Sequence, residues 1–423
     1  MLLSELENKK IAIWGMGREG QSVKMALKGK GVVLIDKSLE TETLENLTRV
    51  DVVIKSPGIS RFHPLMLEAL KSGVKFTTNT NIFLSECRKL EKRPIIIGVT
   101  GTKGKSTTSS LIYHGLKKLG KKVMLGGNIG KPLLDILPFV NDLEYVVCEL
   151  SSYQCAELNK YLDYSIVLNL YKEHIDWHLS HDQYFNDKLN ITNYSLANPI
   201  VNFMDEEIKT RLKGKNLTYF NKEEELCYKD EGYYYHSQRI LDKDDVNVIG
   251  DHNRVNFLSI LALFKNLKID LNNLKGIFDD FKPLHHRLEK IAFKNGITYI
   301  NDSISTTPET TIAALNAFLP NNIILMVGGY DRQQDFSQLV EFIGKNEEKI
   351  AVICMYETGK RLYEKVKNKK NYHYFENLLD SWECVLRLQK KDDYVLLSPA
   401  SPSYGHFKNF EERGEEFTRL VNR

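Results

Sequence analysis

The stretch VTGTKGKSTT, residues 99–108, decides how the chain folds. The apolar run IIIGVTG leads into it and a helical pattern follows, so a glycine-rich turn joins a strand to a helix. Such a turn exposes several backbone N–H groups to one phosphate, and the positive helix end strengthens the site. Lys105 would reach β and γ phosphates, and the Ser106 hydroxyl would ligate Mg²⁺. The strict Walker pattern needs glycine in place of Val99, so this is not a standard P-loop.

A second glycine pattern lies upstream, in IAIWGMGREG, residues 11–20. Gly15, Gly17 and Gly20 have the G-x-G-x-x-G spacing of a dinucleotide-binding turn. The runs KIAIWG, GVVLID, VDVVIKSPG and GVKFTTN alternate with helical stretches, which favours a parallel sheet. A dehydrogenase would explain this turn but leaves the second phosphate cradle unexplained.

The same alternation continues to the end of the chain, interrupted by a tyrosine-rich patch that predicts short hairpins at an edge. We predict an α/β protein of three domains. The charged stretch CRKLEKRP and the stretch FKPLHHRLEKI mark the boundaries. The predicted domains are a Rossmann-like domain at 1–91, a P-loop-type ATP-binding α/β domain at 92–284, and a Rossmann-like α/β domain at 285–423.

Bulk composition is that of a soluble globular protein, with 42% apolar and 27% charged residues in 423. A net charge of +3, from 58 basic and 55 acidic residues, gives no reason to expect nucleic acid or an acidic membrane. The N-terminal MLLSELENKK lacks the apolar core of a signal peptide, so we expect a cytoplasmic protein. The six cysteines are scattered without a C-x-x-C pair, which predicts reduced thiols and no structural zinc.

Several isolated residues are candidates for phosphate chemistry. Glu149 ends the predicted strand before LSSYQ, where ligands bind in open α/β sheets, and could share Mg²⁺ with Ser106. His174, Asp176 and His178 follow another strand, and we interpret the last two as ordinary surface residues. Lys188, taken alone, is typical of a plain helix lysine.

Two further motifs carry groups suited to a nucleotide. Asn253, in HNRVN, would cap a helix or contact an adenine edge. Arg287, in HHRLE, would clamp a phosphate or form a linker salt bridge.

An ordered set of short motifs runs along the chain: GTKGKST, ELSSYQ, LNLYKEHID, HNRVN, HHRLE, NDS, VGGYDR and SPASPSYGHFKNFEERG. Together these motifs resemble one family, the Mur ligases. These are ATP-dependent amide ligases of peptidoglycan synthesis. The set covers nearly the whole chain and is most similar to the glutamate-adding members. Folylpolyglutamate synthases share the ATP motifs but lack such an N-terminal domain.

The resemblance implies that the first cradle holds the uridine diphosphate of a sugar substrate, UDP-N-acetylmuramoyl-L-alanine, and that the second holds ATP. The residues implied to bind the nucleotide sugar are Gly15, Met16, Gly17, Asp36, Lys37, Ser56, Pro57 and Gly58, with Asn128 and Ser151 near its reacting end. Those implied to bind ATP are Gly101, Thr102, Lys103, Gly104, Lys105, Ser106, Thr107, Asn253, Arg287 and Asp302. Those implied to shape the glutamate site are Thr306, Arg332, Ser403, Tyr404 and Phe410.

The implied reaction activates the alanyl carboxylate as an acyl phosphate, which the glutamate amine then attacks. Lys105 would stabilise the transferring phosphoryl group. Two Mg²⁺ ions are implied, held by Ser106, Glu149, His174 and a Lys188 that CO₂ has carbamylated. The resemblance thus overturns the plain interpretation of Lys188. We expect a monomer that acts on small molecules.

The resemblance leaves two alternatives for the enantiomer of glutamate. Most relatives have a lysine where this chain has Ile304, and Tyr404 and Gly405 replace the usual leucine and aspartate. An offshoot of the family adds L-glutamate, and WGMGREG with SISTTPET is similar to it. We nevertheless favour D-glutamate, the substrate of the larger group. The remaining alternatives are a nucleotide-binding regulatory protein without ligase chemistry and an amide ligase of the folate or cyanophycin type.

Overall fold

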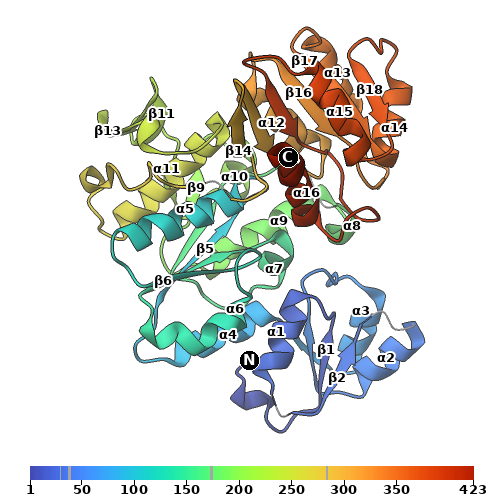
Figure 1. The fold of residues 1–423 in the computed structure, drawn as a ribbon. Helices are drawn as coiled ribbons and strands as arrows, with labels where there is room; N and C mark the ends of the chain where they lie inside the picture. The colour runs from blue at the N-terminus through green and yellow to red at the C-terminus, as the bar shows by residue number, and fades with distance from the viewer. Residues whose placement is uncertain (29, 37–39, 172–174, 283) are drawn as a thin grey trace. The chain divides into compact units, whose positions relative to one another are not determined.

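The computed structural model describes residues 1–28, 30–36, 40–171, 175–282 and 284–423 (Figure 1). No helix in these ranges is long and apolar enough to cross a membrane.

Two compact units divide the chain. The first comprises Met1–Asn247 and His252–Phe281, and the second comprises Val248–Asp251 and Lys282–Arg423. The finer division at residues 91 and 284 stays a prediction.

The first sheet of the first unit is parallel, as predicted, with the order β2-β1-β3-β4. Its strands are β1 (Ile11–Trp14), β2 (Val32–Ile35), β3 (Val52–Lys55) and β4 (Lys75–Thr77), and its helices are α1 (Arg18–Ala26), α2 (Glu40–Thr48), α3 (Pro64–Lys71) and α4 (Asn79–Lys89). Because β1 lies between β2 and β3, the chain direction across the sheet reverses at β1. The turn after β1 therefore occupies the position where open α/β sheets bind ligands.

The second sheet is also parallel, with the order β10-β9-β8-β5-β7-β6. Its strands are β5 (Ile95–Thr100), β6 (Val123–Gly127), β7 (Tyr145–Glu149), β8 (Tyr164–Val167), β9 (Ile200–Asn202) and β10 (Thr218–Phe220). Its helices are α5 (Lys105–Lys118), α6 (Leu133–Ile136), α7 (Ser152–Glu157), α8 (Ile175–His178), α9 (His181–Leu189), α10 (Glu206–Arg211) and α11 (Asp251–Asn266). Since β5 separates β8 from β7, the loop between β5 and α5 is a second switch point.

The tyrosine-rich patch forms the predicted hairpins, a small antiparallel sheet of β11 (Leu226–Lys229), β12 (Gly232–Tyr235) and β13 (Gln238–Asp242) (Figure 1). The charged stretch at 87–94 is only partly a linker, because α4 continues through its first three residues to Lys89. Cys87 is fully buried there, and the helix extends because this apolar side chain completes its inner face.

The two parallel sheets of the first unit share one hydrophobic core. A continuous cluster contains Ile11 and Ile13 of β1, Phe83 of α4, Leu133 of α6 and Val146 of β7. Burial of such side chains stabilises the unit by roughly 1.5–3 kcal/mol each. The turn after β1 and the loop after β5 therefore belong to one packed body.

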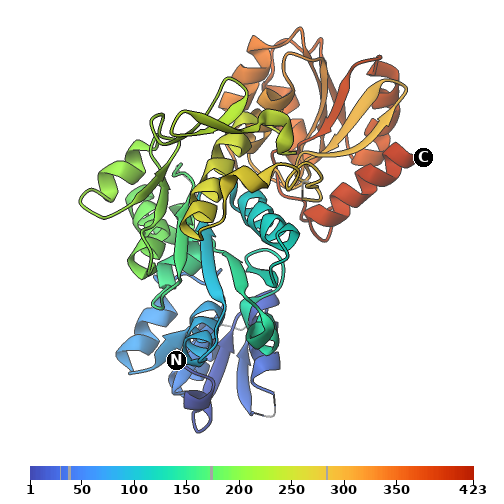
Figure 2. The same ribbon diagram turned by 90° about the vertical axis from the view of Figure 1, so that its left-hand side faces the viewer.

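The second unit has one six-stranded sheet with the order β14-β15-β19-β16-β17-β18, in which only the edge strand β14 is antiparallel. Its strands are β14 (Glu289–Lys294), β15 (Ile297–Asn301), β16 (Ile323–Val327), β17 (Ile350–Met355), β18 (Tyr372–Phe375) and β19 (Tyr394–Leu397). Its helices are α12 (Pro308–Phe318), α13 (Ser337–Lys345), α14 (Tyr356–Lys365), α15 (Leu378–Leu388) and α16 (Phe410–Asn422). Separate hydrophobic clusters cover its two faces, and α16 packs on one of them (Figures 1 and 2).

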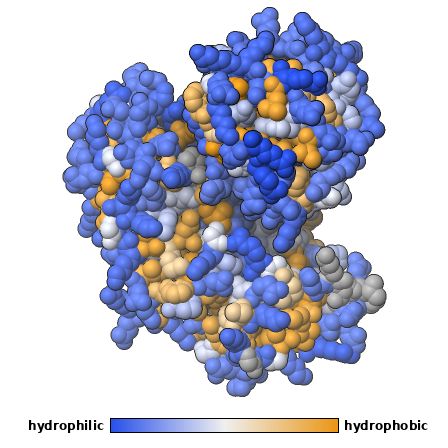
Figure 3. Space-filling view, viewed as in Figure 1, coloured by the Kyte–Doolittle hydropathy of each residue, from blue (hydrophilic) through white to orange (hydrophobic). Residues whose placement is uncertain are grey.

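All six cysteines are free and buried, as the scattered pattern predicts. Hydrophilic residues cover most of the visible face, with hydrophobic residues gathered in smaller areas (Figure 3). The α/β class and the parallel sheets predicted from the sequence are confirmed.

Candidate active site

The loop between β5 and α5 is shaped by the backbone of Gly104 and by the side chain of Asn169. Gly104 has a φ of +82°, and a Cβ there would lie 2.1 Å from Asn256 Nδ2. Asn169 clamps the loop, because its Oδ1 accepts from Lys103 N at 2.8 Å and its Nδ2 donates to Lys103 O at 3.1 Å. The loop is therefore held in a strained form that only glycine adopts readily.

Two lysine side chains converge on one carbonyl of this loop. Lys105 Nζ donates to Gly101 O at 2.9 Å and to Thr102 O at 2.9 Å. Lys188 Nζ donates to the same Gly101 O at 3.0 Å, although Lys188 and Gly101 are 87 positions apart in the chain. Lys188 is 2% exposed, so it is no plain surface lysine of a helix. A buried ammonium beside a phosphate loop is suited to phosphoryl chemistry.

Glu149 lies at the end of β7, paired in register with Val99 of β5. It is fully buried, and its Oε1 accepts from Asn128 Nδ2 at 2.8 Å. Its Oε2 is buried without a hydrogen-bond partner among the described residues. An orphaned carboxylate oxygen is a ligand that Mg²⁺ prefers, so this residue fits the predicted metal role. Ser106 and Thr107 are buried in the first turn of α5.

The turn after β1, which is predicted to bind the nucleotide sugar, is closed by Ser56, whose Oγ donates to Gly15 O at 2.7 Å. Gly20 is required there, since a Cβ would lie 2.0 Å from Gly15 O. Met16 N donates to Asp36 Oδ1 at 3.4 Å, and Gly17 precedes the first residue of α1. The turn thus brings together predicted residues that are up to 41 positions apart.

Further predicted residues flank this turn. Pro57 O accepts from Trp177 Nε1 at 3.1 Å, and Gly58 is exposed beside it. Ser151 caps α7 by accepting from Gln154 N at 3.2 Å. Gln154 Nε2 in turn donates to Glu19 Oε1 at 2.6 Å, and burial raises the pKa of Glu19 to about 7. The first turn of α1 and the start of α7 are therefore directly linked.

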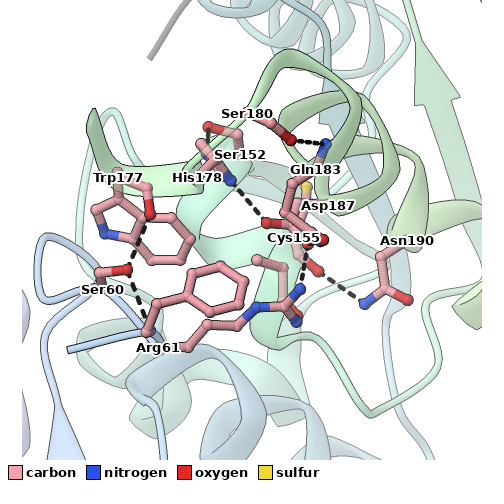
Figure 4. A network of polar contacts seen from close by, with 12 residues as sticks. Ser60, Arg61, Ser152, Cys155, Trp177, His178, Ser180, Gln183, Asp187 and Asn190 are labelled. Carbon is pink, nitrogen blue, oxygen red and sulfur yellow. Dashed lines mark hydrogen bonds and ion pairs between the residues drawn. The ribbon is translucent and has the colours of Figure 1, made fainter. Parts of the chain in front are cut away.

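The interpretation of His178 as a surface residue is wrong (Figure 4). The ring is fully buried, and its Nδ1 lies 2.7 Å from Asp187 Oδ2 while its Nε2 lies 3.0 Å from Ser152 Oγ. Arg61 Nη2 donates to the other oxygen of Asp187 at 2.6 Å. Sequence analysis missed Arg61 and Asp187, and the only signal was the adjacency of Asp187 to Lys188.

In the second unit, Asp302 follows β15 and is 2% exposed. Its Oδ1 accepts from Leu288 N at 3.2 Å and its Oδ2 accepts from Ser398 Oγ at 2.8 Å. Burial raises the pKa of Asp302 to about 6, although hydrogen bonds and the nearby Arg287 charge oppose the rise. The charge of Arg287 therefore acts on the Asp302 carboxyl group.

The loops after β15, β19 and β16 carry the predicted glutamate residues. Arg332 lies over the Tyr404 ring at 5.3 Å, Ser403 is buried, and Thr306 O accepts from Gln334 Nε2 at 2.9 Å. Phe410 O accepts from Ser303 Oγ at 2.8 Å. These three strands are neighbours in the sheet, so their carboxyl ends form one edge.

Sequence analysis missed Arg413, a fully buried arginine of α16. Its Nε and Nη2 donate to Ser303, at Oγ and O, and its Nη1 donates to Ser401 O at 3.0 Å. Burial lowers its pKa to about 10. The arginine ties the loop after β15 to the loop after β19, and its place in the FEERG stretch was the only sequence signal.

Some predicted residues cannot be compared. His174 and Lys37 lie outside the described residues. Asn253 is buried in α11 of the first unit, whereas Arg287 and Asp302 belong to the second unit. The first unit therefore brings together the loop between β5 and α5, Lys188, Glu149 and Asn128. The second unit carries the residues that are predicted to shape the glutamate site.

Comparison with known protein families gives two matches. Residues 99–264 match the Mur ligase middle domain, and residues 286–401 match the Mur ligase glutamate ligase domain.

Relatives of similar sequence are named as ligases. A UDP-N-acetylmuramoyl-L-alanine--L-glutamate ligase of Xanthomonas axonopodis pv. citri (strain 306) is 32% identical, with 100% of this chain and 97% of the relative covered. A UDP-N-acetylmuramoylalanine--D-glutamate ligase of Clostridium perfringens (strain 13 / Type A) is 33% identical over 90% of this chain and 84% of the relative. Among solved structures, MurC from Thermotoga maritima has a TM-score of 0.62 at 19% identity, covering 98% of this chain and 99% of its own.

Proposed function

Because the chain belongs to the Mur ligase family, we propose that it is an ATP-dependent, ADP-forming amide ligase that joins glutamate to UDP-N-acetylmuramoyl-L-alanine. The observation that carries the proposal is the meeting of Lys105 and Lys188 at Gly101 O. A regulatory protein without chemistry would have no use for a second, buried lysine at the phosphate loop.

In the proposed reaction, an oxygen of the alanyl carboxylate attacks the γ-phosphorus of ATP. The bond to ADP breaks, and an acyl phosphate forms. The glutamate amine then attacks the acyl carbon, loses a proton, and inorganic phosphate leaves. A carboxylate is a poor electrophile, so the protein's task is to position the groups and to neutralise charge.

The residues of this chain divide these tasks. The backbone N–H groups of the loop and Lys105 would hold the β and γ phosphates. Ser106, Glu149, His174 and a carbamylated Lys188 would hold two Mg²⁺ ions, which supply further charge neutralisation when bound. Asn128 would keep Glu149 oriented, as its 2.8 Å hydrogen bond supports.

The nucleotide sugar would bind at the turn after β1, with Asp36 and Lys37 near the uracil and Ser56, Pro57 and Gly58 on the other side. Asn128 and Ser151 would lie near the reacting end. Arg287, Asp302 and Asn253 would complete the ATP site, and the loops after β15, β16 and β19 would receive glutamate. A cytoplasmic location and a monomeric state stay predictions.

The relatives differ in the glutamate enantiomer for which they are named. The relative that matches this chain over its full length is named for L-glutamate, and one of nearly equal identity over a shorter length is named for D-glutamate. We propose L-glutamate on the support of full-length similarity and of Ile304 in the glutamate region. D-glutamate, which the sequence analysis favours because it is the substrate of the larger group, stays the rival prediction.

The test is phosphate release from ATP in the presence of UDP-N-acetylmuramoyl-L-alanine and each glutamate enantiomer, with mass spectrometry of the product. Release that requires both substrates, with a product heavier by one glutamyl residue, supports the ligase. A folate-type ligase would ignore the nucleotide sugar, and a regulatory protein would release no phosphate.

A further inference from the structure

Asp187 is a buried carboxylate with three side-chain partners (Figure 4). It accepts from Arg61 Nη2 at 2.6 Å and Gln183 Nε2 at 2.7 Å, and His178 Nδ1 lies 2.7 Å away. A carboxylate only accepts, so Nδ1 of His178 carries the proton. Charge-assisted hydrogen bonds of this kind are stronger and more directional than neutral ones.

One of the three partners of Asp187, Arg61, comes from the part of the chain that follows β3. Arg61 belongs to the stretch Ser56–Phe62, which we define as the sugar loop because it contains three residues proposed to bind the nucleotide sugar. Ser60 Oγ donates to Trp177 O at 2.9 Å, and Trp177 Nε1 donates to Pro57 O at 3.1 Å. The sugar loop is therefore fastened to the segment 177–187 at three points.

Another face of α9 reaches the phosphate loop. Lys188 Nζ donates to Gly101 O, and Tyr184 OH lies 2.9 Å from Thr102 Oγ1. Consecutive helix residues point about 100° apart, so Asp187 and Lys188 serve different neighbours. One short helix thus touches both loops that are proposed to hold the two nucleotides.

The Ser152–His178–Asp187 order is also that of a hydrolase triad. A nucleophile must meet its substrate, however, and Ser152 is 4% exposed and lies within α7. The network has a buried serine, a buried ring and a cationic partner for its carboxylate. It is built to hold segments in place.

We propose that Asp187, through Arg61 and His178, is a positioning residue that couples the sugar loop to the Lys188 helix, so that the alanyl carboxylate reaches the phosphate loop. The inference rests on the proposed function for its kinetic consequence. Its structural consequence, the ordering of the sugar loop by Asp187, is independent of that function.

The kinetic test uses Asp187→Asn, Arg61→Gln and the double variant. Each single change raises KM for the nucleotide sugar and lowers kcat, each by about tenfold, while KM for ATP stays within about twofold. The double variant is no worse than the poorer single one, because both changes break the same contact. Additive losses, or a loss of active protein with unchanged KM, would overturn the coupling.

The matched control is Asp182→Asn, the same substitution in the same helix, at an exposed aspartate that pairs with Arg211. It leaves both KM values unchanged. If Asp182→Asn changed the KM values as Asp187→Asn does, the effect would come from general destabilisation of α9, and the proposal would be overturned.

Amide hydrogen exchange gives a readout without catalysis. In Asp187→Asn, exchange of residues 56–62 becomes faster by about tenfold or more, while exchange in β5 is unchanged. In the Asp182→Asn control, exchange of residues 56–62 is unchanged as well. Unchanged exchange in the sugar loop would contradict the proposal even if wild-type protein proved to be an active ligase. If wild type released no phosphate yet the exchange changed as expected, only the proposed function would fail.

Discussion

Lys105 has the simplest role to test at the scale of single residues. In Lys105→Ala we expect the rate of ligation to fall on the order of 10³-fold or more, because a charge clamp on the transferring phosphoryl group is lost. Its side chain donates to two backbone carbonyls of the loop, and we expect the fold to persist without these hydrogen bonds. The measurement is phosphate release alongside circular dichroism, with the exposed Lys117→Ala of the same helix as control. Turnover near that of wild type would remove Lys105 from the mechanism.

Lys188 carries the proposed carbamate. Lys188→Ala should be nearly inactive and partly restored by acetate or formate, since a short carboxylate can replace the lost oxygen ligands. Lys188→Arg keeps the cation but cannot form a carbamate, so it should stay inactive. The rates are compared with ¹³C NMR of wild-type protein in labelled bicarbonate. A fully active arginine variant, or no carbamate signal, would count against the modification.

Asp302 makes the stability of the second unit depend on pH. Its pKa rises from 3.8 to about 6, so between these values the unfolded chain ionises while the folded one stays protonated. Stability from this group is thus full below about pH 4 and is lost as pH rises through about 6, by about 3 kcal/mol in all.

In Asp302→Asn this loss is absent, so the variant should be more stable than wild type at pH 7 by up to about 3 kcal/mol and nearly equal to it at pH 4. Chemical unfolding at both pH values measures the difference, with the exposed Asp380→Asn as control. A difference that does not change between the two pH values would refute the burial argument.

At the scale of elements, the turn between β1 and α1 depends on Gly20. In Gly20→Ala the new methyl group would meet Gly15 O at 2.0 Å, so the turn must open. Overpacking of this kind costs typically about 1–3 kcal/mol. We expect a higher KM for the nucleotide sugar and an unchanged KM for ATP.

Gly31→Ala is the control, because nothing lies within 4 Å of a Cβ there. Steady-state kinetics of both variants make the comparison. If KM for ATP rose in Gly20→Ala as much as KM for the sugar substrate, the two loops would not have separate roles.

The elements also show why parts of the structure could be predicted. β5 and α5 follow from an apolar run, a glycine turn and a helical pattern, all of which are local. The pairing of Lys188 with Gly101 and of Arg61 with Asp187 joins positions 87 and 126 residues apart, which no local pattern encodes. His178 was misjudged for the same reason, since its burial depends on Ser152 and Asp187.

At the scale of the whole molecule, the shared core explains why the first two predicted domains form one unit. α4 begins and ends with residues of ordinary helix pattern, yet its buried Ile82, Phe83 and Leu84 pack into the cluster that also contains residues of β7. Sequence periodicity identifies an apolar face but does not name the surface that it will meet. The family resemblance supplied the roles of residues whose contacts the sequence could not show.

The most direct test of the account is phosphate release by the wild-type protein, measured with ATP and Mg²⁺ and with each substrate omitted in turn. We predict release only when UDP-N-acetylmuramoyl-L-alanine and glutamate are both present, one phosphate for each product molecule, with kcat/KM higher for L-glutamate than for D-glutamate. A preference for D-glutamate would contradict the proposed enantiomer but would still support the proposed ligase function. No release with either enantiomer would contradict the central claim.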